Sequence, residues 1–130
     1  MLLDTHVLVR WLTAPGRLSR EQARVLRAAA RHGDQLALSA VTLLEIAVLF
    51  GEGSTRLKVP VQELFGSIES SGAFYIIPFD VELAAEVAAL GDALRDPADR
   101  AIVATARVHR LRLVTSDQRI IESKLVPVVE

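Results

Sequence analysis

Short apolar runs alternate along the chain with longer segments in which hydrophobic residues recur at helical spacing. The short runs are rich in Leu, Ile and Val, which is typical of strands buried on both faces of a sheet. This alternation predicts the α/β class, with a three-layer α/β/α sandwich around a mostly parallel sheet of about five strands. The predicted strands are Leu2–Asp4, Leu36–Ser39, Tyr75–Pro78, Arg112–Thr115 and Val126–Val129.

The longer segments carry the start and stop signals of helices. Asp80 is placed to cap a helix over Val81–Leu94. Asp96 fits the N-cap of the next helix and Pro97 its first position, where no backbone donor is needed, and this helix is expected to run to about His109. The other predicted helices are Arg20–Arg31, a helix that runs through Leu44–Phe50, and Val61–Ser70. Either Ser39 or Thr42 can cap the helix that runs through Leu44–Phe50.

Composition and charge narrow the possible functions. A chain of 130 residues has the size of one domain, so a single domain over residues 1–130 is expected. The absence of cysteine excludes disulfides, thiolate zinc sites and cysteine nucleophiles, and fits a reducing compartment. The net charge of −1 gives no strong overall attraction for nucleic acid, so a polyanion would have to bind a local patch.

The beginning of the chain predicts neither a signal peptide nor a membrane anchor. No basic region precedes its apolar stretch, and Asp4 and Arg10 interrupt that stretch well short of a membrane span. A cytoplasmic protein without membrane contact is therefore expected. The sequence also has no glycine-rich phosphate loop and no nucleophile-elbow motif, which leaves P-loop enzymes and serine hydrolases without support.

Four of the sixteen acidic residues fall at strand ends or within the helix that follows a strand. Asp4 ends the first strand and Asp117 follows the fourth. Glu45 lies in the helix after the second strand, and Asp99 lies in the first turn of the helix capped by Asp96. Ligands of open α/β sheets bind outside the carboxyl ends of the strands. These four carboxylates are therefore expected to converge.

Clustered carboxylates at such an edge predict a metal site. Glu45 has apolar neighbours almost all round its helix, so its charge should be partly buried and should need a counter-charge. Several carboxylates close together raise one another's pKa values unless a divalent ion neutralises them. Oxygen ligands without cysteine favour Mg²⁺, with Mn²⁺ as the alternative.

Structural roles are the competing interpretation of the same acids. Asp96 is placed as an ordinary helix cap, and Asp99 one turn later would complement the helix dipole. Asp117 fits a turn or a cap. Asp4 and Glu45 are harder to explain in this way because both interrupt apolar surroundings.

Four segments, in this order and spanning nearly the whole chain, resemble the PIN-domain proteins and specifically the VapC toxins. They are Leu-Leu-Asp4-Thr5-His6, Ser39-Ala-Val-Thr42-Leu-Leu-Glu45-Ile, Asp96-Pro-Ala-Asp99-Arg100-Ala-Ile-Val-Ala and Val-Thr115-Ser-Asp117. The resemblance implies a PIN-like fold and a metal-dependent endoribonuclease. It also implies a VapB-type antitoxin that wraps the toxin and blocks its acidic pocket.

Position by position, Asp4, Glu45, Asp99 and Asp117 match the family's acidic quartet. The resemblance makes Asp4 and Asp99 the direct metal ligands. In supporting positions, Asp96 assists electrostatically or caps its helix, while Thr5 and Thr115 fall where hydroxyl groups support the site. Two positions depart from the commonest pattern, with Ala98 where an aromatic residue is frequent and His6 where Asn is common.

Two candidate RNA contacts come from the arginines. Arg100, next to Asp99, is a candidate for a substrate phosphate, with a contact to solvent on the helix surface as the alternative. The basic face of the predicted helix Arg20–Arg31 is a candidate RNA track, with an ordinary solvated face as the alternative. Its members are Arg20, Arg24, Arg27 and Arg31. Few aromatic residues are available for base stacking, so selection by RNA shape is expected.

Other functions and partners also follow from the pattern. A phosphoacceptor signalling domain places acids around Mg²⁺ in a similar way, but neither Lys58 nor Lys124 follows a strand end as that chemistry requires. A catalytically idle PIN-like module that binds RNA or a protein is the main alternative to the nuclease. A hydrophobic content of 51% and the region of Trp11 and Leu12 favour a homodimer and an antitoxin groove, with Trp11 in the core as the alternative.

Overall fold

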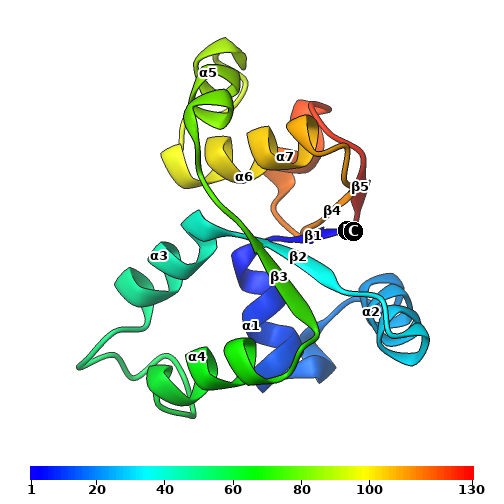
Figure 1. Ribbon diagram of the computed structural model, residues 1–130, viewed down its shortest axis with the longest axis vertical. Helices are drawn as coiled ribbons and strands as arrows, with labels where there is room; N and C mark the ends of the chain where they lie inside the picture. The colour runs from blue at the N-terminus through cyan, green and yellow to red at the C-terminus, as the bar shows by residue number, and fades with distance from the viewer.

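The protein is built on a five-stranded, all-parallel sheet with the strand order β3-β2-β1-β4-β5 (Figure 1). The computed structural model describes residues 1–130. Each predicted strand is present, with ends that differ by one to two residues, so the predicted α/β class is confirmed. The strands are β1 (Leu2–Leu3), β2 (Leu36–Ser39), β3 (Phe74–Ile77), β4 (Leu113–Val114) and β5 (Val128–Val129).

Helices connect every pair of consecutive strands. The first connection contains α1 (Thr5–Thr13), a short 3₁₀ turn η1 (Pro15–Arg17) and α2 (Arg20–His32). The remaining helices are α3 (Ala40–Leu49), α4 (Val61–Ser70), α5 (Val81–Ala89), α6 (Pro97–Val108) and α7 (Gln118–Ser123). No helix is both long enough and apolar enough to cross a bilayer.

One helix boundary differs by several residues from the sequence prediction, and one helix cap that the sequence left open is defined by the structure. α5 ends at Ala89 instead of Leu94, because Gly91 adopts a left-handed conformation with φ of 74° that stops the helix. α3 begins at Ala40, and of its two predicted caps Ser39 is the one used, because the Ser39 hydroxyl accepts a hydrogen bond from the Val41 amide directly at the strand end. α1 and α7 had no predicted bounds.

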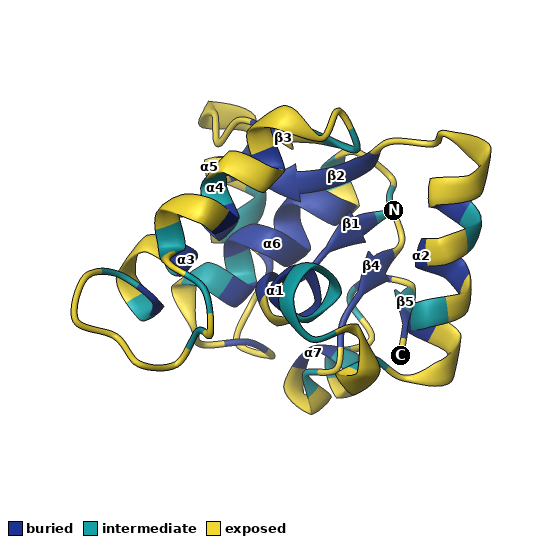
Figure 2. Ribbon diagram, turned by 90° about the horizontal axis from the view of Figure 1, so that it is seen from below, coloured by how far each residue is buried: buried dark blue, intermediate teal, exposed yellow.

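Two hydrophobic clusters cover the two faces of the sheet. Leu3 and Val114 face α1, α2, α3 and α4, whereas their neighbours Leu2 and Leu113 face α5, α6 and α7. This alternation is the period-two geometry of a strand, and it accounts for the uniformly apolar strand sequences. Figure 1 shows α5, α6 and α7 above the sheet and α1 and α4 below it. Figure 2 shows β1, β2 and β4 buried and the exposed residues on the outer helix faces, while the edge strand β3 is partly exposed through Tyr75 and Ile76.

The strand order creates a crevice at one point of the sheet. From β1 the chain adds β2 and β3 on one side, and it then crosses to add β4 and β5 on the other. The connections after β1 and β4 therefore leave the shared edge in opposite directions. Such a reversal point, outside the carboxyl ends of the strands, is where open α/β sheets bind ligands.

Candidate active site

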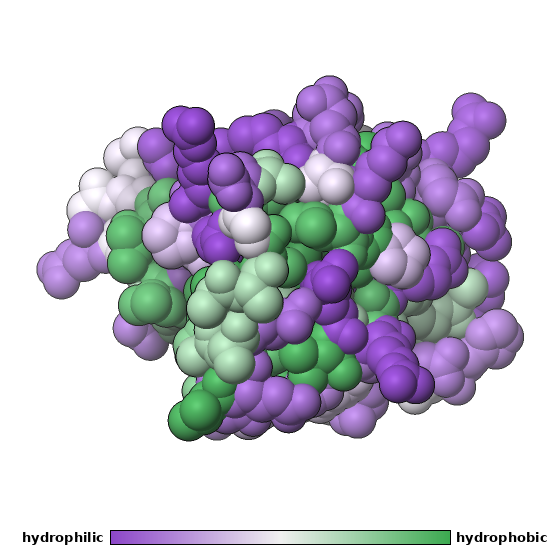
Figure 3. Space-filling view, turned by 90° about the horizontal axis from the view of Figure 1, so that it is seen from above, coloured by the Kyte–Doolittle hydropathy of each residue, from purple (hydrophilic) through white to green (hydrophobic).

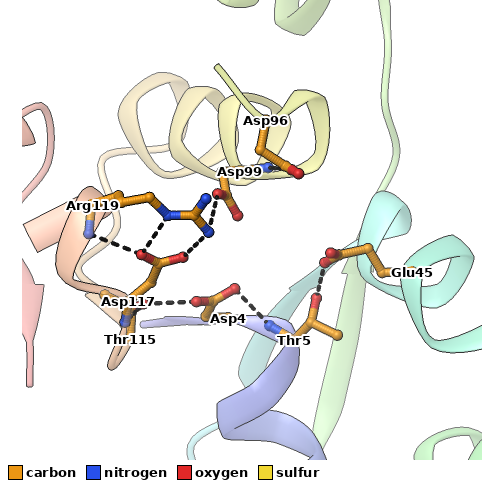
Figure 4. Close-up of polar contacts among 8 residues, drawn as sticks. All are labelled: Asp4, Thr5, Glu45, Asp96, Asp99, Thr115, Asp117 and Arg119. Carbon is orange, nitrogen blue, oxygen red and sulfur yellow. Dashed lines mark hydrogen bonds and ion pairs between the residues drawn. The ribbon is translucent and has the colours of Figure 1, made fainter. Parts of the chain in front are cut away.

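Asp4 lies at this reversal point and is held at both carboxylate oxygens. It follows β1 directly and is the N-cap of α1, with Oδ1 accepting a hydrogen bond from the Thr5 amide at 2.8 Å. Its Oδ2 accepts a hydrogen bond of 2.7 Å from the Thr115 hydroxyl, which comes from the end of β4 (Figure 4). Asp4 is only 6% exposed. The side chain is thus buried and fixed in direction.

Thr115 joins Asp4 to Asp117. The Thr115 hydroxyl, completely buried, donates to Asp4 and accepts a hydrogen bond of 3.0 Å from the Asp117 amide. Asp117 then caps α7, with its Oδ1 accepting from the Arg119 amide at 2.9 Å. One hydroxyl therefore sets the relative positions of the acids that follow β1 and β4.

Glu45 approaches from the other side, on α3. Its Oε1 accepts a short hydrogen bond from the Thr5 hydroxyl, which also lies 3.2 Å from the buried hydroxyl of Thr42 (Figure 4). Because Thr5 follows Asp4 in the chain, the same turn of backbone orients both carboxylates. Glu45 is half-buried, as the apolar sequence around it predicted.

Asp96 and Asp99 stand at the beginning of α6. Asp96 is exposed and caps the helix, its Oδ1 accepting a hydrogen bond of 3.0 Å from the Asp99 amide. Asp99 is only 9% exposed and points toward Asp4 and Asp117 (Figure 4). Asp96 thus has the capping role that the sequence offered, and Asp99 has more than a dipole role because its carboxylate faces the site.

Arg119 belongs to the site and was not predicted. Its Nη2 lies 3.0 Å from Asp117 Oδ2 and 3.5 Å from Asp99 Oδ2, so the guanidinium bridges two of the acids. Its exposed position in the first turn of α7 brings it back over its own cap residue. The only signal was an arginine two residues after Asp117, which is indistinguishable in sequence from a solvent-exposed helix residue.

Burial and the neighbouring negative charges raise the pKa values of three of these acids. Burial raises the pKa of Asp99 to about 7, and the negative charges of Asp96, Asp117 and Asp4 add to that rise. Burial also raises the pKa of Asp4 and of Glu45, while their hydrogen bonds from threonine hydroxyls oppose the rise. Asp117 is the exception, because hydrogen bonding from Arg119 lowers its pKa.

The donor set matches a hard divalent cation. Every candidate ligand is a carboxylate oxygen, and a cation would relieve the repulsion that raises the pKa of Asp99. The side chains are not arranged as a closed cage, since no three of the acidic and histidine side chains lie within reach of one ion. Asp4 and Asp99 are the most buried carboxylates of the group.

Arg100 does not face this site, which corrects its assignment as an RNA-binding candidate. Its guanidinium donates hydrogen bonds to the carbonyl oxygens of Val87, Gly91 and Leu94, at 2.6, 2.5 and 2.6 Å. These carbonyls lie at the end of α5 and in the turn after it. Arg100 therefore fastens the α5–α6 connection, with both Nη atoms donating to carbonyl oxygens of the protein.

Two surface features from the sequence are the arginines of α2 and the region of Trp11 and Leu12. The arginines of α2 are exposed, and Arg24 pairs with Glu21. Trp11 and Leu12 are half-buried and pack against the core cluster that includes α1. The region of Trp11 and Leu12 is therefore mainly a core contact.

Comparison with known proteins agrees with this geometry. Residues 1–124 match the family described as the PIN domain. The chain belongs to the PIN-domain family. It is 38% identical to Ribonuclease VapC22 of Mycobacterium tuberculosis over 125 residues, which are 92% of this chain and 88% of that protein. The resemblance inferred from the four sequence segments is thus confirmed.

Solved structures have the same fold as this PIN domain. VapBC2 of Rickettsia felis, bound to a DNA fragment from its promoter, contains a chain that matches with a TM-score of 0.74 and 16% identity, covering 98% of this chain and 96% of that one. FitAcB of Neisseria gonorrhoeae contains one that matches with a TM-score of 0.71 and 25% identity, covering 99% and 96%. The likeness to the Rickettsia protein concerns the fold alone.

Proposed function

We propose that this PIN-domain protein is a divalent-metal-dependent endoribonuclease and the toxin of a type II toxin–antitoxin pair. The observation that carries the proposal is the group of buried acids at the reversal point of the sheet, where Asp99 points toward Asp4. The similarity to a protein named as a ribonuclease supports RNA as the substrate.

The metal is Mg²⁺ in this proposal, with Mn²⁺ as the alternative. Asp4 and Asp99 would hold it, and Glu45 and Asp117 would complete the acidic set through water or a second ion. When bound, such an ion neutralises charge on a phosphodiester and makes water a better nucleophile at neutral pH.

The protein's own groups prepare the site for that chemistry. Thr115 fixes Asp4, and Thr5 fixes Oε1 of Glu45 while leaving Oε2 to accept a hydrogen bond from the attacking water. The guanidinium of Arg119 keeps Asp117 ionised and supplies the one positive charge among the acids. Together these contacts orient a water molecule and a phosphate before any reaction, which is the main requirement for in-line attack.

A VapB-type antitoxin, a homodimer and a cytoplasmic location are part of the same proposal. VapBC2 of Rickettsia felis and VapBC of Salmonella typhimurium contain chains with a fold similar to this one. An apolar patch beside Glu45 supports a protein contact, since Leu44, Val48 and Phe79 are 63%, 75% and 44% exposed. They line a groove of about 390 Å³ that also includes Glu45 and Ala98. Figure 3 shows hydrophobic surface at its left edge, on the side where Figure 1 shows α3.

The direct test is to incubate the purified protein with a total RNA preparation and Mg²⁺, and to map the new RNA ends. EDTA and the Asp4→Asn variant are the negative controls. Discrete cleavage that disappears in both controls supports the nuclease and identifies its substrate. Absence of cleavage by a folded, metal-binding protein would instead favour the idle PIN-like module.

A further inference from the structure

A groove lined by basic residues lies beside α1, apart from the carboxylates. It has a volume of about 520 Å³ and lies between α1, η1 and the connection from α3 to α4. That connection lies on the same lower side of the sheet as α1 in Figure 1. The basic lining residues are His6, Arg10, Arg17, Arg56 and Lys58, and none of the lining residues is acidic. We call this feature the basic groove.

The concentration of positive charge in the basic groove is unusual for this chain. Four of the ten lining residues are Arg or Lys, against 15 in all 130 residues. None of the four takes part in an ion pair, because the ion pairs of the protein involve only Arg24, Arg107 and Arg119. Unpaired cations around one concave surface attract an anion, even though the net charge of the molecule is −1.

The basic groove adjoins the carboxylates through His6. This residue follows Thr5 on α1 and lines the groove. Directly before it in the chain stand Asp4 and Thr5, the residue whose hydroxyl binds Glu45. The basic groove therefore begins two residues after Asp4, beside the turn that holds Asp4 and Glu45.

We propose that the basic groove binds the phosphate backbone of the single-stranded RNA segment next to the scissile phosphate. The inference rests on the proposed nuclease function. A cluster of acids repels a polyanion, so a substrate needs a nearby source of positive charge to be held there. Three of the four cations are arginines, which contact phosphate in bidentate fashion. The groove's one aromatic residue, Phe50, is buried, so the contact should be to the backbone and independent of sequence.

The test compares two triple variants that remove the same charge. The first, Arg10→Ala/Arg17→Ala/Arg56→Ala, changes the basic groove. The second removes three unpaired arginines from α2, the competing RNA track: Arg20→Ala/Arg27→Ala/Arg31→Ala. Both are made in the Asp4→Asn background, so that RNA binds without being cut, and binding of a labelled single-stranded RNA of mixed sequence is followed by fluorescence anisotropy over a range of salt concentrations with Mg²⁺ present.

The groove variant should bind RNA at least about tenfold more weakly. The slope of log K for RNA binding against the logarithm of the salt concentration should become shallower by about 0.7 for each lost phosphate contact. The α2 variant should bind as the parent does. Thermal unfolding of both variants checks that they are folded. Should the first variant not fold, Arg56→Ala/Lys58→Ala decides, because both residues are exposed on the connection between helices.

Equal losses in both variants, a loss confined to the α2 variant, or no RNA binding by the parent would each overturn the inference. So would unchanged RNA binding accompanied by lost binding of the antitoxin, which would make the groove a protein-binding surface. Groove-dependent binding by the Asp4→Asn protein, together with no RNA cleavage by the protein with Asp4 intact, would refute the proposed nuclease while leaving the groove assignment standing.

Discussion

At the scale of single residues, two threonines organise the acids. Thr115 and Thr5 each follow a central strand and place one hydroxyl on a carboxylate from elsewhere in the chain. Buried charge is stable only when such donors or a cation accompany it. The sequence indicated the positions of both hydroxyls, but not their partners, because a hydrogen bond between β1 and β4 depends on strand order.

Thr115→Val should impair both stability and activity. It leaves Asp4 Oδ2 without a donor and the backbone N–H of Asp117 without an acceptor. This should lower the free energy of unfolding by about 1–3 kcal/mol. The rate of RNA cleavage should also fall, because Asp4 is no longer fixed. Thr105→Val is the matched control, since that buried hydroxyl only bonds to the Ala101 carbonyl within α6. Denaturant unfolding and cleavage rates measure the two effects, and equal activity of both variants would contradict the role of Thr115.

Asp99 should make the metal-free protein less stable as the pH rises. Its pKa is raised from 3.8 to about 7 on folding, so the folded state holds the proton more tightly than the unfolded chain. The corresponding stability is present below about pH 4 and is lost as the pH rises through about 7. Asp4 and Glu45, whose pKa values are also raised, act in the same direction.

Thermal unfolding in EDTA, followed between about pH 4 and pH 8, measures this effect. Asp99→Asn should show a clearly smaller decrease in Tm than the parent. Identical pH profiles for the two proteins would show that Asp99 ionises normally and is not crowded by its neighbours.

At the scale of elements, the sequence predicted those strands and helix starts that depend on local signals alone. The Asp96-Pro97 start of α6 and the strand positions follow from capping and from apolar runs, and both occur as predicted. α1 had no predicted bounds because Asp4 ends the strand and caps the helix at once, leaving no loop between them. α7 is only six residues long, which is fewer than two turns and too short for a recurring hydrophobic face.

The Arg100 result shows the limit of the same reasoning. A position next to Asp99 suggested a phosphate contact, yet Gly91 ends α5 early and exposes carbonyl groups that Arg100 binds. The carbonyl groups that Arg100 binds are available only because α5 ends at Ala89, whereas the hydrophobic periodicity predicted a helix to Leu94. Likewise, Arg119 belongs to the site only because its side chain reaches from the first turn of α7 back to Asp117.

Arg100→Ala should therefore destabilise the protein with little effect on the cleavage rate at saturating RNA. Three carbonyl groups lose a charged donor, which should cost about 2 kcal/mol or more. Arg95→Ala, an exposed arginine on the same connection, is the control and should be neutral. Chemical unfolding and steady-state kinetics separate the effects. A large fall in cleavage rate without loss of stability would restore Arg100 as a substrate contact.

At the scale of the whole molecule, strand order decides where the acids meet. The central strands β2, β1 and β4 are adjacent although β4 begins more than a hundred residues after β1. Sequence could predict that the carboxyl ends share one edge, because parallel strands require it. It could not predict the basic groove, whose arginines come from three separate segments.

Mg²⁺ should stabilise the folded protein through these acids. A metal that binds only the native state adds about 2.7 kcal/mol at a hundredfold excess over its Kd, so Tm should rise on titration. Asp99→Asn should lose this response, while Asp34→Asn, which changes an exposed acid just before the amino end of β2, should keep it. Calorimetry with and without Mg²⁺ measures the shift. An equal rise for both variants would place the metal elsewhere.

The most direct test of the acidic site is the single-turnover cleavage rate at a mapped RNA position, compared between Asp4→Asn and Asp34→Asn in Mg²⁺. Each variant removes one negative charge, so their difference reports the location of the charge and not its number. Loss of several kcal/mol of transition-state stabilisation should slow Asp4→Asn by about a hundredfold or more, with Asp34→Asn unchanged. Equal rates for the two folded variants would contradict the assignment of the active site to the carboxylates between β1 and β4.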